Sequence, residues 1–326
     1  MKTLLTSLVI AQTVGWATPT ISNLTQTVIV VVGASGTPEY ASEFARWAGL
    51  WEKACSRGQA GFIAIGLDED GAPTERERVR EALAAQTQQT TAPLWLVLIG
   101  HGTFDGRTAR FNLRGSDLTA SDLAEWLKPI DRPLAVINTA SASAPFLKEL
   151  SAPGRVVITA TKSGFEYNYA RFGQCLAEAI AQPQADLDKD GQTSLLEAYL
   201  TASHTVGAFY TAEGRLATEH ALLDDNGDGL GTPAEWFRGI RPVQRVRDDT
   251  TLDGYRAHQF HLVPSPTETA MPTELRTRRD QLELQVIELR DTKAQFSEAE
   301  YFSRLEALLR EIAHIYEQVG LSGADH

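Results

Sequence analysis

Cysteine is scarce in this sequence, which holds only Cys55 and Cys175 among its 326 residues. Neither cysteine lies at a metal-ligand spacing, so the pattern excludes a cysteine-bound metal. In an oxidising compartment the two could pair as a disulfide. In a core of this size they could instead be two buried thiols, and the sequence leaves both options open.

Positive charge is also in short supply, since 30 Lys and Arg residues oppose 42 Asp and Glu residues, a formal net charge of -12. This acidic balance argues against nucleic acid and anionic membranes as partners, and it suits a protein that collects cations. The apolar content of 43% is ample for a buried core, which excludes global disorder.

Long apolar runs are absent beyond the amino terminus, so the sequence offers no transmembrane helix. Residues 4–17 form one apolar run after Lys2, with small residues before Thr18, and this pattern predicts a signal peptide cleaved near Ala17. The mature chain is then expected to be secreted or periplasmic, with no stable membrane anchor. The alternative interpretation of residues 4–17 is a buried N-terminal helix.

The alternation of strand and helix patterns predicts an α/β fold with a doubly wound, mainly parallel sheet. Strands are expected at 27–33, 61–66, 94–100, 134–138 and 155–160, and helices at 39–56, 74–86 and 119–127. An EF-hand-like helical segment and a C-terminal helical hairpin follow. The expected organisation is a signal peptide at 1–17, the α/β domain at 18–180, a calcium-binding segment at 181–263, a linker at 264–272 and a hairpin or coiled coil at 273–326.

Two acidic stretches match the calcium-loop pattern D-x-[DN]-x-[DN]-G-x5-E at every specified position. Calcium is a hard cation that takes six to eight oxygen ligands, so this pattern of carboxylates around a turn-forming Gly predicts Ca²⁺ binding. The two loops begin at Asp186 and Asp224, with helical segments expected around both, as in an EF-hand pair. Solvated acidic turns are the alternative.

The pattern assigns side-chain ligands at positions 1, 3, 5 and 12, a backbone carbonyl at position 7, and a contact often made through water at position 9. In the first loop these are Asp186, Asp188, Asp190, Glu197, Gln192 and Ser194. In the second loop they are Asp224, Asn226, Asp228, Glu235, Leu230 and Thr232.

Three polar residues follow the expected strands that should be neighbours in a sheet of order 2-1-3-4-5. They are Ser35, His101 and Ser141. Because the carboxyl ends of parallel strands meet at one edge, we expect these residues to face one crevice. A His beside a hydroxyl, with the Gly102 backbone near enough to receive an oxyanion, is a candidate arrangement for acyl transfer. The alternative is a pair of tight turns.

This layout resembles the caspase/legumain superfamily, and in particular bacterial legumain-like peptidases. In legumain one strand ends in His-Gly and the next in Ala-Cys; His101-Gly102 matches the first motif, and Ala140-Ser141 falls where Ala-Cys would be. The resemblance places the orienting Asn near Ser35 and the substrate-binding Arg near Ala41. It thus implies the superfamily's fold, with the cysteine nucleophile replaced by Ser.

A Ser hydroxyl is far less acidic than a Cys thiol, so Ser141 would need a well-oriented general base. His101 would in turn need a partner on its other ring nitrogen, and Asp105 is one candidate. The leading hypothesis is therefore a catalytically degenerate peptidase homologue that binds protein or peptide. The alternatives are an active hydrolase using Ser141 and His101, and a structural protein that self-associates through its C-terminal helices.

Overall fold

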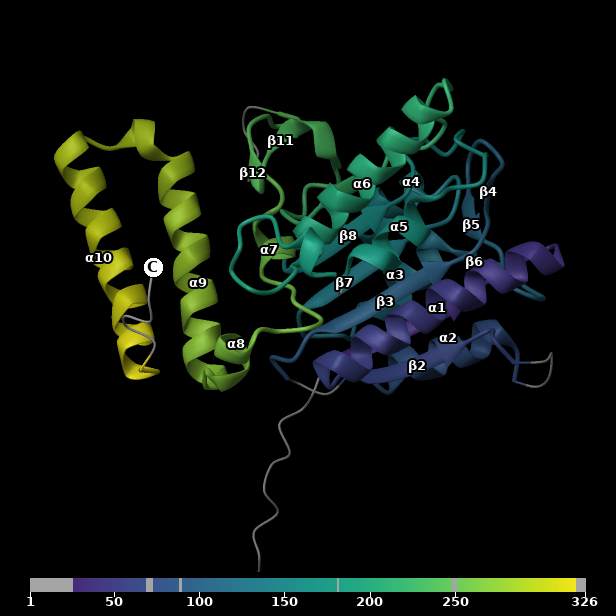
Figure 1. The fold of residues 1–326 in the computed structure, drawn as a ribbon, viewed down its shortest axis with the longest axis horizontal. Coiled ribbons are helices and arrows are strands. Elements are labelled where there is room, and N and C mark those ends of the chain that lie inside the picture. The colour runs from purple at the N-terminus through teal and green to yellow at the C-terminus, as the bar shows by residue number, and fades with distance from the viewer. Residues whose placement is uncertain (1–25, 69–72, 88–89, 181, 248–250, 321–326) are drawn as a thin grey trace, which may run out of the picture.

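The computed structural model describes residues 26–320 except 69–72, 88–89, 181 and 248–250 (Figure 1). The predicted signal peptide lies outside the described residues. Within them, no helix combines the length and apolarity needed to cross a membrane.

The core of the fold is a seven-stranded sheet of order β10-β9-β8-β7-β3-β1-β2. The strands β1, β2, β3, β7 and β8 run parallel, and the parallel part has the predicted order. Their bounds are β1 Thr27–Val32, β2 Gly61–Ile65, β3 Leu94–Ile99, β7 Leu134–Asn138 and β8 Arg155–Thr159. The predicted α/β fold with a mainly parallel sheet is thus confirmed.

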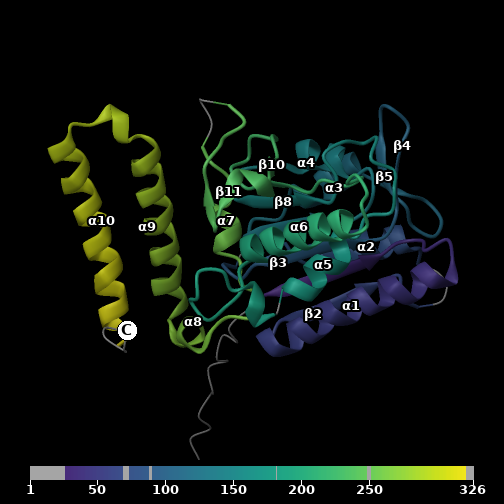
Figure 2. The ribbon, with the colours of Figure 1, turned by 45° about the horizontal axis from the view of Figure 1, so that its top comes forward.

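Helices cover both faces of this sheet (Figures 1 and 2). One apolar cluster joins the sheet to α1 Pro38–Gly58, α5 Phe172–Ala179 and α6 Leu195–Ala212, and the other joins it to α2 Glu75–Ala84, α3 Ala120–Leu127 and α4 Ala144–Leu150. Threonines fix the first turns of two helices: the Thr74 and Thr119 hydroxyls each accept a hydrogen bond from the backbone three residues on. The helices therefore begin where the sequence pattern placed them.

Two small sheets accompany the central one. At its carboxyl edge lie β4 Gly102–Phe104, β5 Ala109–Phe111 and β6 Leu118–Thr119, while β11 Phe237–Arg238 and β12 Arg241–Pro242 form a second small sheet on the other side of the domain (Figure 1). The short 3₁₀ helices are η1 Pro183–Ala185, η2 Ala234–Trp236 and η3 Lys293–Gln295.

The region 181–263 departs from the prediction of a separate helical segment. β9 Leu222–Asp224 pairs with β8, and β10 Thr232–Pro233 pairs with β9, so both strands belong to the central sheet. The second acidic loop therefore connects two strands, and only the short 3₁₀ helix η2 follows it, in place of the α-helix expected there. Further along, the chain forms the short helix α7 Tyr255–His258, and His261 makes one isolated bridge with Ser194.

The region 264–272, predicted as a linker, contains the helix α8 Pro266–Ala270. The carboxylate of Glu268 is buried, and Arg279 donates to both of its oxygens, at 2.6 and 2.9 Å. This bidentate pair ties α8 to α9, so the segment is structured and packed rather than a free connection.

The predicted C-terminal hairpin is present as α9 Thr273–Asp291 and α10 Glu298–Gln318 (Figures 1 and 2). Leu282 and Ile315 form the centre of a small separate core between them. The Gln259 side chain donates to the Asp280 carbonyl at 2.9 Å, which links the hairpin to the sheet domain. Both cysteines are free thiols, Cys55 buried and Cys175 half-buried.

Candidate functional site

The residues predicted at the strand ends come together through the backbone. β1, β3 and β7 are neighbours in the sheet, and Ser35, His101 and Ser141 follow their carboxyl ends. The Nε2 atom of His101 lies 3.2 Å from the carbonyl oxygen of Ser35. Among the described residues this is the only hydrogen bond of the imidazole, so the main chain of Ser35, and not its hydroxyl, orients His101.

The Ser141 hydroxyl is held by the residue after His101. It donates to the Gly102 carbonyl at 3.2 Å, and the Gly102 N–H donates back to it at 3.4 Å. The side chain is nearly closed off, with 4% of the residue exposed. The predicted oxyanion donor, the Gly102 N–H, is therefore engaged by the hydroxyl that would have to attack a substrate.

The turn after Ser141 is held in a sparsely populated backbone conformation. Ala142 has φ +52°, in the left-handed region that side chains with a Cβ rarely occupy. Its N–H donates to the Glu166 carbonyl at 2.9 Å, and the Ala144 N–H donates to the Thr161 hydroxyl. These contacts maintain a strained turn at the end of β7, and strained turns are common beside functional sites.

An aromatic enclosure surrounds His101. Its ring lies 4.8 Å from that of Tyr40, 5.2 Å from Phe44 and 6.3 Å from Tyr169, measured between centroids. Burial lowers the pKa of His101 below its usual value, and the bond to the Ser35 carbonyl opposes this shift only in part. The imidazole is thus kept neutral, the form a general base requires.

Asp105 is the carboxylate that the sequence offers as a partner for His101. Asp105 instead accepts hydrogen bonds from the backbone N–H groups of Thr108 and Arg107 and from the Arg110 guanidinium at 2.8 Å. The Thr108 backbone first, and then Arg110, lower the pKa of Asp105 to about 2. Asp105 therefore closes its own turn and does not orient the imidazole.

Exposed aromatic side chains lie next to this edge of the sheet. Phe165 and Tyr167 are 64% and 53% exposed. Phe165 packs edge-on against Phe104 of β4, with ring centroids 5.2 Å apart, and lies 6.0 Å from Tyr167. We call Phe104, Phe165 and Tyr167 the aromatic cluster; it is an apolar surface beside the strand ends.

A hollow of about 1070 Å³ lies at the opposite edge of the sheet, away from the strand-end residues. Gln26, Pro93 and Pro133, each just before a strand, line it together with Met271 and Arg276. This hollow is therefore separate from the strand-end residues and from the aromatic cluster.

The first acidic loop has the conformation that its sequence pattern predicts. Asp186 accepts hydrogen bonds from the backbone N–H groups of Lys189 and Gly191, which have φ +66° and +87°. Ser194 is the N-cap of α6, and Glu197 completes a capping box with it. The carboxylates of Asp186, Asp188 and Asp190 have ligand atoms within 4.8 Å of one another.

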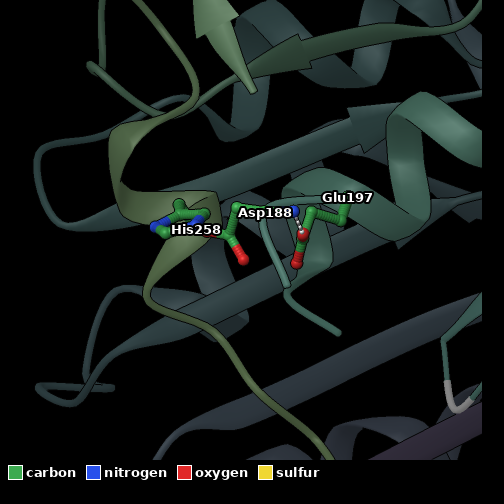
Figure 3. A group of neighbouring side chains, drawn as sticks. All are labelled: Asp188, Glu197 and His258. Carbon is green, nitrogen blue, oxygen red and sulfur yellow. Dashed lines mark hydrogen bonds and ion pairs between the residues drawn. The ribbon is translucent and has the colours of Figure 1, made fainter. Parts of the chain in front are cut away.

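Asp188 and Glu197 also form a close group with His258 (Figure 3). The Nε2 atom of His258, on α7, lies 3.0 Å from the Asp188 carboxylate. Sequence analysis missed this residue, because His258 lies 61 residues beyond Glu197 and outside the twelve-residue pattern. Only the tertiary fold brings α7 against the loop.

The second acidic loop repeats the turn geometry of the first. Asp224 accepts hydrogen bonds from the N–H groups of Gly227 and Gly229, each at 3.0 Å, and these glycines have φ +83° and +73°. Asn226 accepts from the Asp228 N–H at 2.8 Å. Glu235, the predicted ligand at position 12, is exposed on η2. Within the described residues, this loop contributes no group of three carboxylates as close as those of the first loop.

No protein-family model matches this chain, and no curated protein sequence matches it. Solved structures similar to it include the Drosophila initiator caspase Dronc, at 13% identity and a TM-score of 0.43, covering 63% of this chain and 81% of that chain. Caspase-1 from Spodoptera frugiperda aligns at 9% identity and a TM-score of 0.40, covering 62% and 87%. A Geobacter sulfurreducens protein aligns at 11% identity and a TM-score of 0.38, covering 56% and 89%. The fold described above rests on the strand order of this chain and not on these likenesses.

Proposed function

We propose that this chain is an exported, calcium-braced caspase/legumain-like domain that has lost cysteine-peptidase activity and binds a protein or peptide at its strand ends. The observation that carries the proposal is the contact between Ser141 and Gly102. The hydroxyl at the nucleophile position is bound on both sides by the Gly102 backbone and is nearly closed off from solvent.

The surroundings of His101 support loss of activity. A general base for a Ser nucleophile needs hydrogen-bond reach to the hydroxyl and a partner that holds its other nitrogen. The imidazole of His101 is instead bound through Nε2 to the Ser35 carbonyl, and Asp105 is bound to Arg110. The site thus keeps a neutral imidazole and a strained turn. The imidazole and the Ser141 hydroxyl are each bound to a backbone carbonyl, so no proton path joins them.

The aromatic cluster supports binding of a peptide. Aromatic side chains supply large contact areas at low entropic cost, and solvent-exposed ones concentrate at interaction surfaces. Phe165 and Tyr167 project from the segment after β8, whose Glu166 carbonyl supports the turn at Ala142. A peptide on this surface would therefore lie beside Ser141.

The two acidic loops support calcium binding as a brace rather than a signal. The first connects the region of α5 to α6, and the second joins β9 to β10 at the edge of the central sheet. Calcium held at these places would stabilise the packing of α6 and the edge of the sheet.

Covalent labelling tests the loss of activity. We expect a serine-directed fluorophosphonate to leave the protein unlabelled, with Ser141→Ala and Ser143→Ala as matched controls. Labelling of the wild type that disappears in Ser141→Ala and persists in Ser143→Ala would overturn the proposal in favour of a hydrolase that uses Ser141 and His101.

Peptide selection tests binding. Peptides selected from a random display library on the wild-type protein should bind it and fail to bind Phe165→Ser. Val243, which is 44% exposed and directly follows β12, supplies the control through Val243→Ser, because β12 and β4 lie at opposite sides of the sheet domain (Figure 1). Selected peptides that bind Phe165→Ser as well as the wild type would contradict a role for the cluster.

A second candidate function is self-association through α10. Phe302 and Leu309 are 51% and 47% exposed and line a shallow hollow of about 460 Å³ on this helix. Light scattering of the full chain should show an oligomer that Leu309→Glu converts to a monomer. A monomeric wild type would exclude this candidate.

A further inference from the structure

The carboxylate that closes the first acidic loop makes a recognisable set of contacts. Glu197 Oε1 accepts hydrogen bonds from the backbone N–H groups of Leu187, at 2.7 Å, and Asp188, at 3.2 Å. Its Oε2 accepts from the Ser194 hydroxyl at 2.8 Å. These donors are positions 2, 3 and 9 of the loop, so Glu197, at position 12, bridges its two ends.

The same three positions of the second loop are bridged by a different residue. Asp253 Oδ1 accepts from the N–H groups of Asp225, at 2.9 Å, and Asn226, at 3.2 Å. Its Oδ2 accepts from the Thr232 hydroxyl at 2.6 Å. Asp253 thus accepts from positions 2, 3 and 9 of its loop as Glu197 does in the first loop, where Glu197 additionally accepts the Ser194 N–H at 2.8 Å.

Glu235 cannot make these contacts because the chain leaves the second loop in another direction. After Ser194 the first loop enters the helix α6, and its first turn brings Glu197 back to the loop. After the equivalent Thr232 the chain continues as the strand β10, where Pro233 pairs with Leu222. The residue at position 12 is carried away and left exposed.

We propose that Asp253, and not Glu235, is the carboxylate ligand that completes the second calcium site. The inference rests on the calcium binding proposed above and deepens it, since it makes the second site a composite of two distant segments. Calcium takes carboxylate oxygens from any part of a chain that presents them at about 2.3–2.6 Å, so a ligand need not belong to the loop itself.

A buried oxygen of the loop supports a cation there independently of the bridge. Asp228, at position 5, accepts the Leu230 N–H through Oδ1, while its Oδ2 is buried with no hydrogen-bond partner among the described residues. Buried carboxylates are normally paired or coordinate a metal. The ion pairs formed between described residues do not include Asp224 or Asp253, which are 1% and 2% exposed.

Asp225 holds Asp253 in position. Its carboxylate accepts from the Gly254 N–H at 2.9 Å and from the Ala257 N–H at 2.8 Å, and it is 2% exposed. The Asp225 N–H in turn donates to Asp253. The two segments are therefore interlocked by reciprocal hydrogen bonds, and the carboxylate of Asp253 is presented to the loop before any ion binds.

Calorimetric titration of calcium into chelator-treated full-length protein tests this assignment. Glu197→Gln removes the closing carboxylate of the first loop while keeping the α6 cap, and so isolates the second site. In that background we compare Asp253→Asn with Glu235→Gln. Asp253→Asn should raise the Kd of the second site by roughly tenfold or more, because ligand charge sets calcium affinity. Glu235→Gln should leave it unchanged within about twofold.

The single variant Asp253→Asn supplies the folding control, because it should still titrate the first site. Because Glu235 is exposed, its replacement by Gln should not unfold the chain. A loss of the second site in Glu235→Gln therefore overturns the assignment, whatever the result for Asp253→Asn. A second site unchanged in Asp253→Asn also overturns it. Absence of calcium heat from the wild type would defeat the proposed calcium binding itself, whereas two intact sites in Asp253→Asn would defeat only the role of Asp253.

Discussion

The two acidic loops share a sequence pattern and a turn geometry, yet they are closed by different means. The first is bridged by Glu197, which lies within its own pattern and in the first turn of α6. The second is bridged by Asp253, which accepts the N–H of Asp225 and lies 28 residues beyond it in the chain. A twelve-residue pattern therefore specifies the turn of such a loop and does not by itself specify what closes it.

The two loops also differ in how closely they contact the rest of the fold. The first loop is largely local, since its hydrogen bonds to Asp186 and Glu197 come from within the pattern. The second is embedded in the fold: β9 pairs with β8, and a side chain at Gly227 would meet the backbone of Ala152 and Pro153 at 2.9 Å. Calcium at the second loop would thus be coupled to the whole sheet.

Removing calcium from both loops should have the largest effect. At calcium concentrations about 100 times Kd, each site adds about 2.7 kcal/mol to the free energy of unfolding, so two sites add about 5 kcal/mol. Chelation should lower Tm by roughly 10 °C. Differential scanning calorimetry with and without chelator measures this shift. An unchanged Tm would contradict stabilisation of the fold by calcium at either loop.

Disabling one loop at a time should show that the loops are unequal. Asp190→Ala and Asp228→Ala should each remove about half of the calcium-dependent stabilisation, about 2.7 kcal/mol. The loss should be larger for Asp190→Ala, because the first loop offers four carboxylates and the second, counting Asp253, offers three. Denaturant unfolding at fixed calcium gives the comparison, and a larger loss for Asp228→Ala would reverse the ranking.

Truncating the two glutamates at position 12 should separate their structural roles in the absence of calcium. Glu197→Ala should lower the free energy of unfolding by about 2 kcal/mol in chelator, because it removes the half of the α6 capping box that Glu197 supplies and leaves the buried Ser194 N–H unpaired. Glu235→Ala should cost less than about 0.5 kcal/mol, as expected for an exposed side chain. Equal costs in urea unfolding would mean that the two positions are equivalent after all.

The smallest effect concerns the contact between α7 and the first loop. His258→Ala should weaken calcium binding at the first loop by about twofold, because Asp188 loses a hydrogen bond worth about 0.5 kcal/mol. The second loop should be unaffected. His204, exposed on α6, provides the control through His204→Ala. A change at the second loop in His258→Ala would show that α7 transmits binding between the two sites.

The sequence alone determined the parts of the fold that depend on local pattern. Continuous apolar runs marked the buried strands β1, β3 and β7, and capping residues such as Thr119 marked where helices begin. The order of the parallel strands followed from the handedness and adjacency rules of such sheets. The two acidic turns were specified by their residues, because Asp and Gly at fixed offsets favour that backbone conformation.

Only the tertiary structure decided what surrounds these elements. The pattern around Thr232 is compatible with a helix, but pairing with β9 makes it a strand and carries Glu235 away from the loop. The closure by Asp253, the contact of His258 with Asp188 and the orientation of His101 by a main-chain carbonyl all join residues distant in sequence. Spacing along a chain predicts neighbours within a turn or a helix, whereas contacts between segments depend on how the whole core packs.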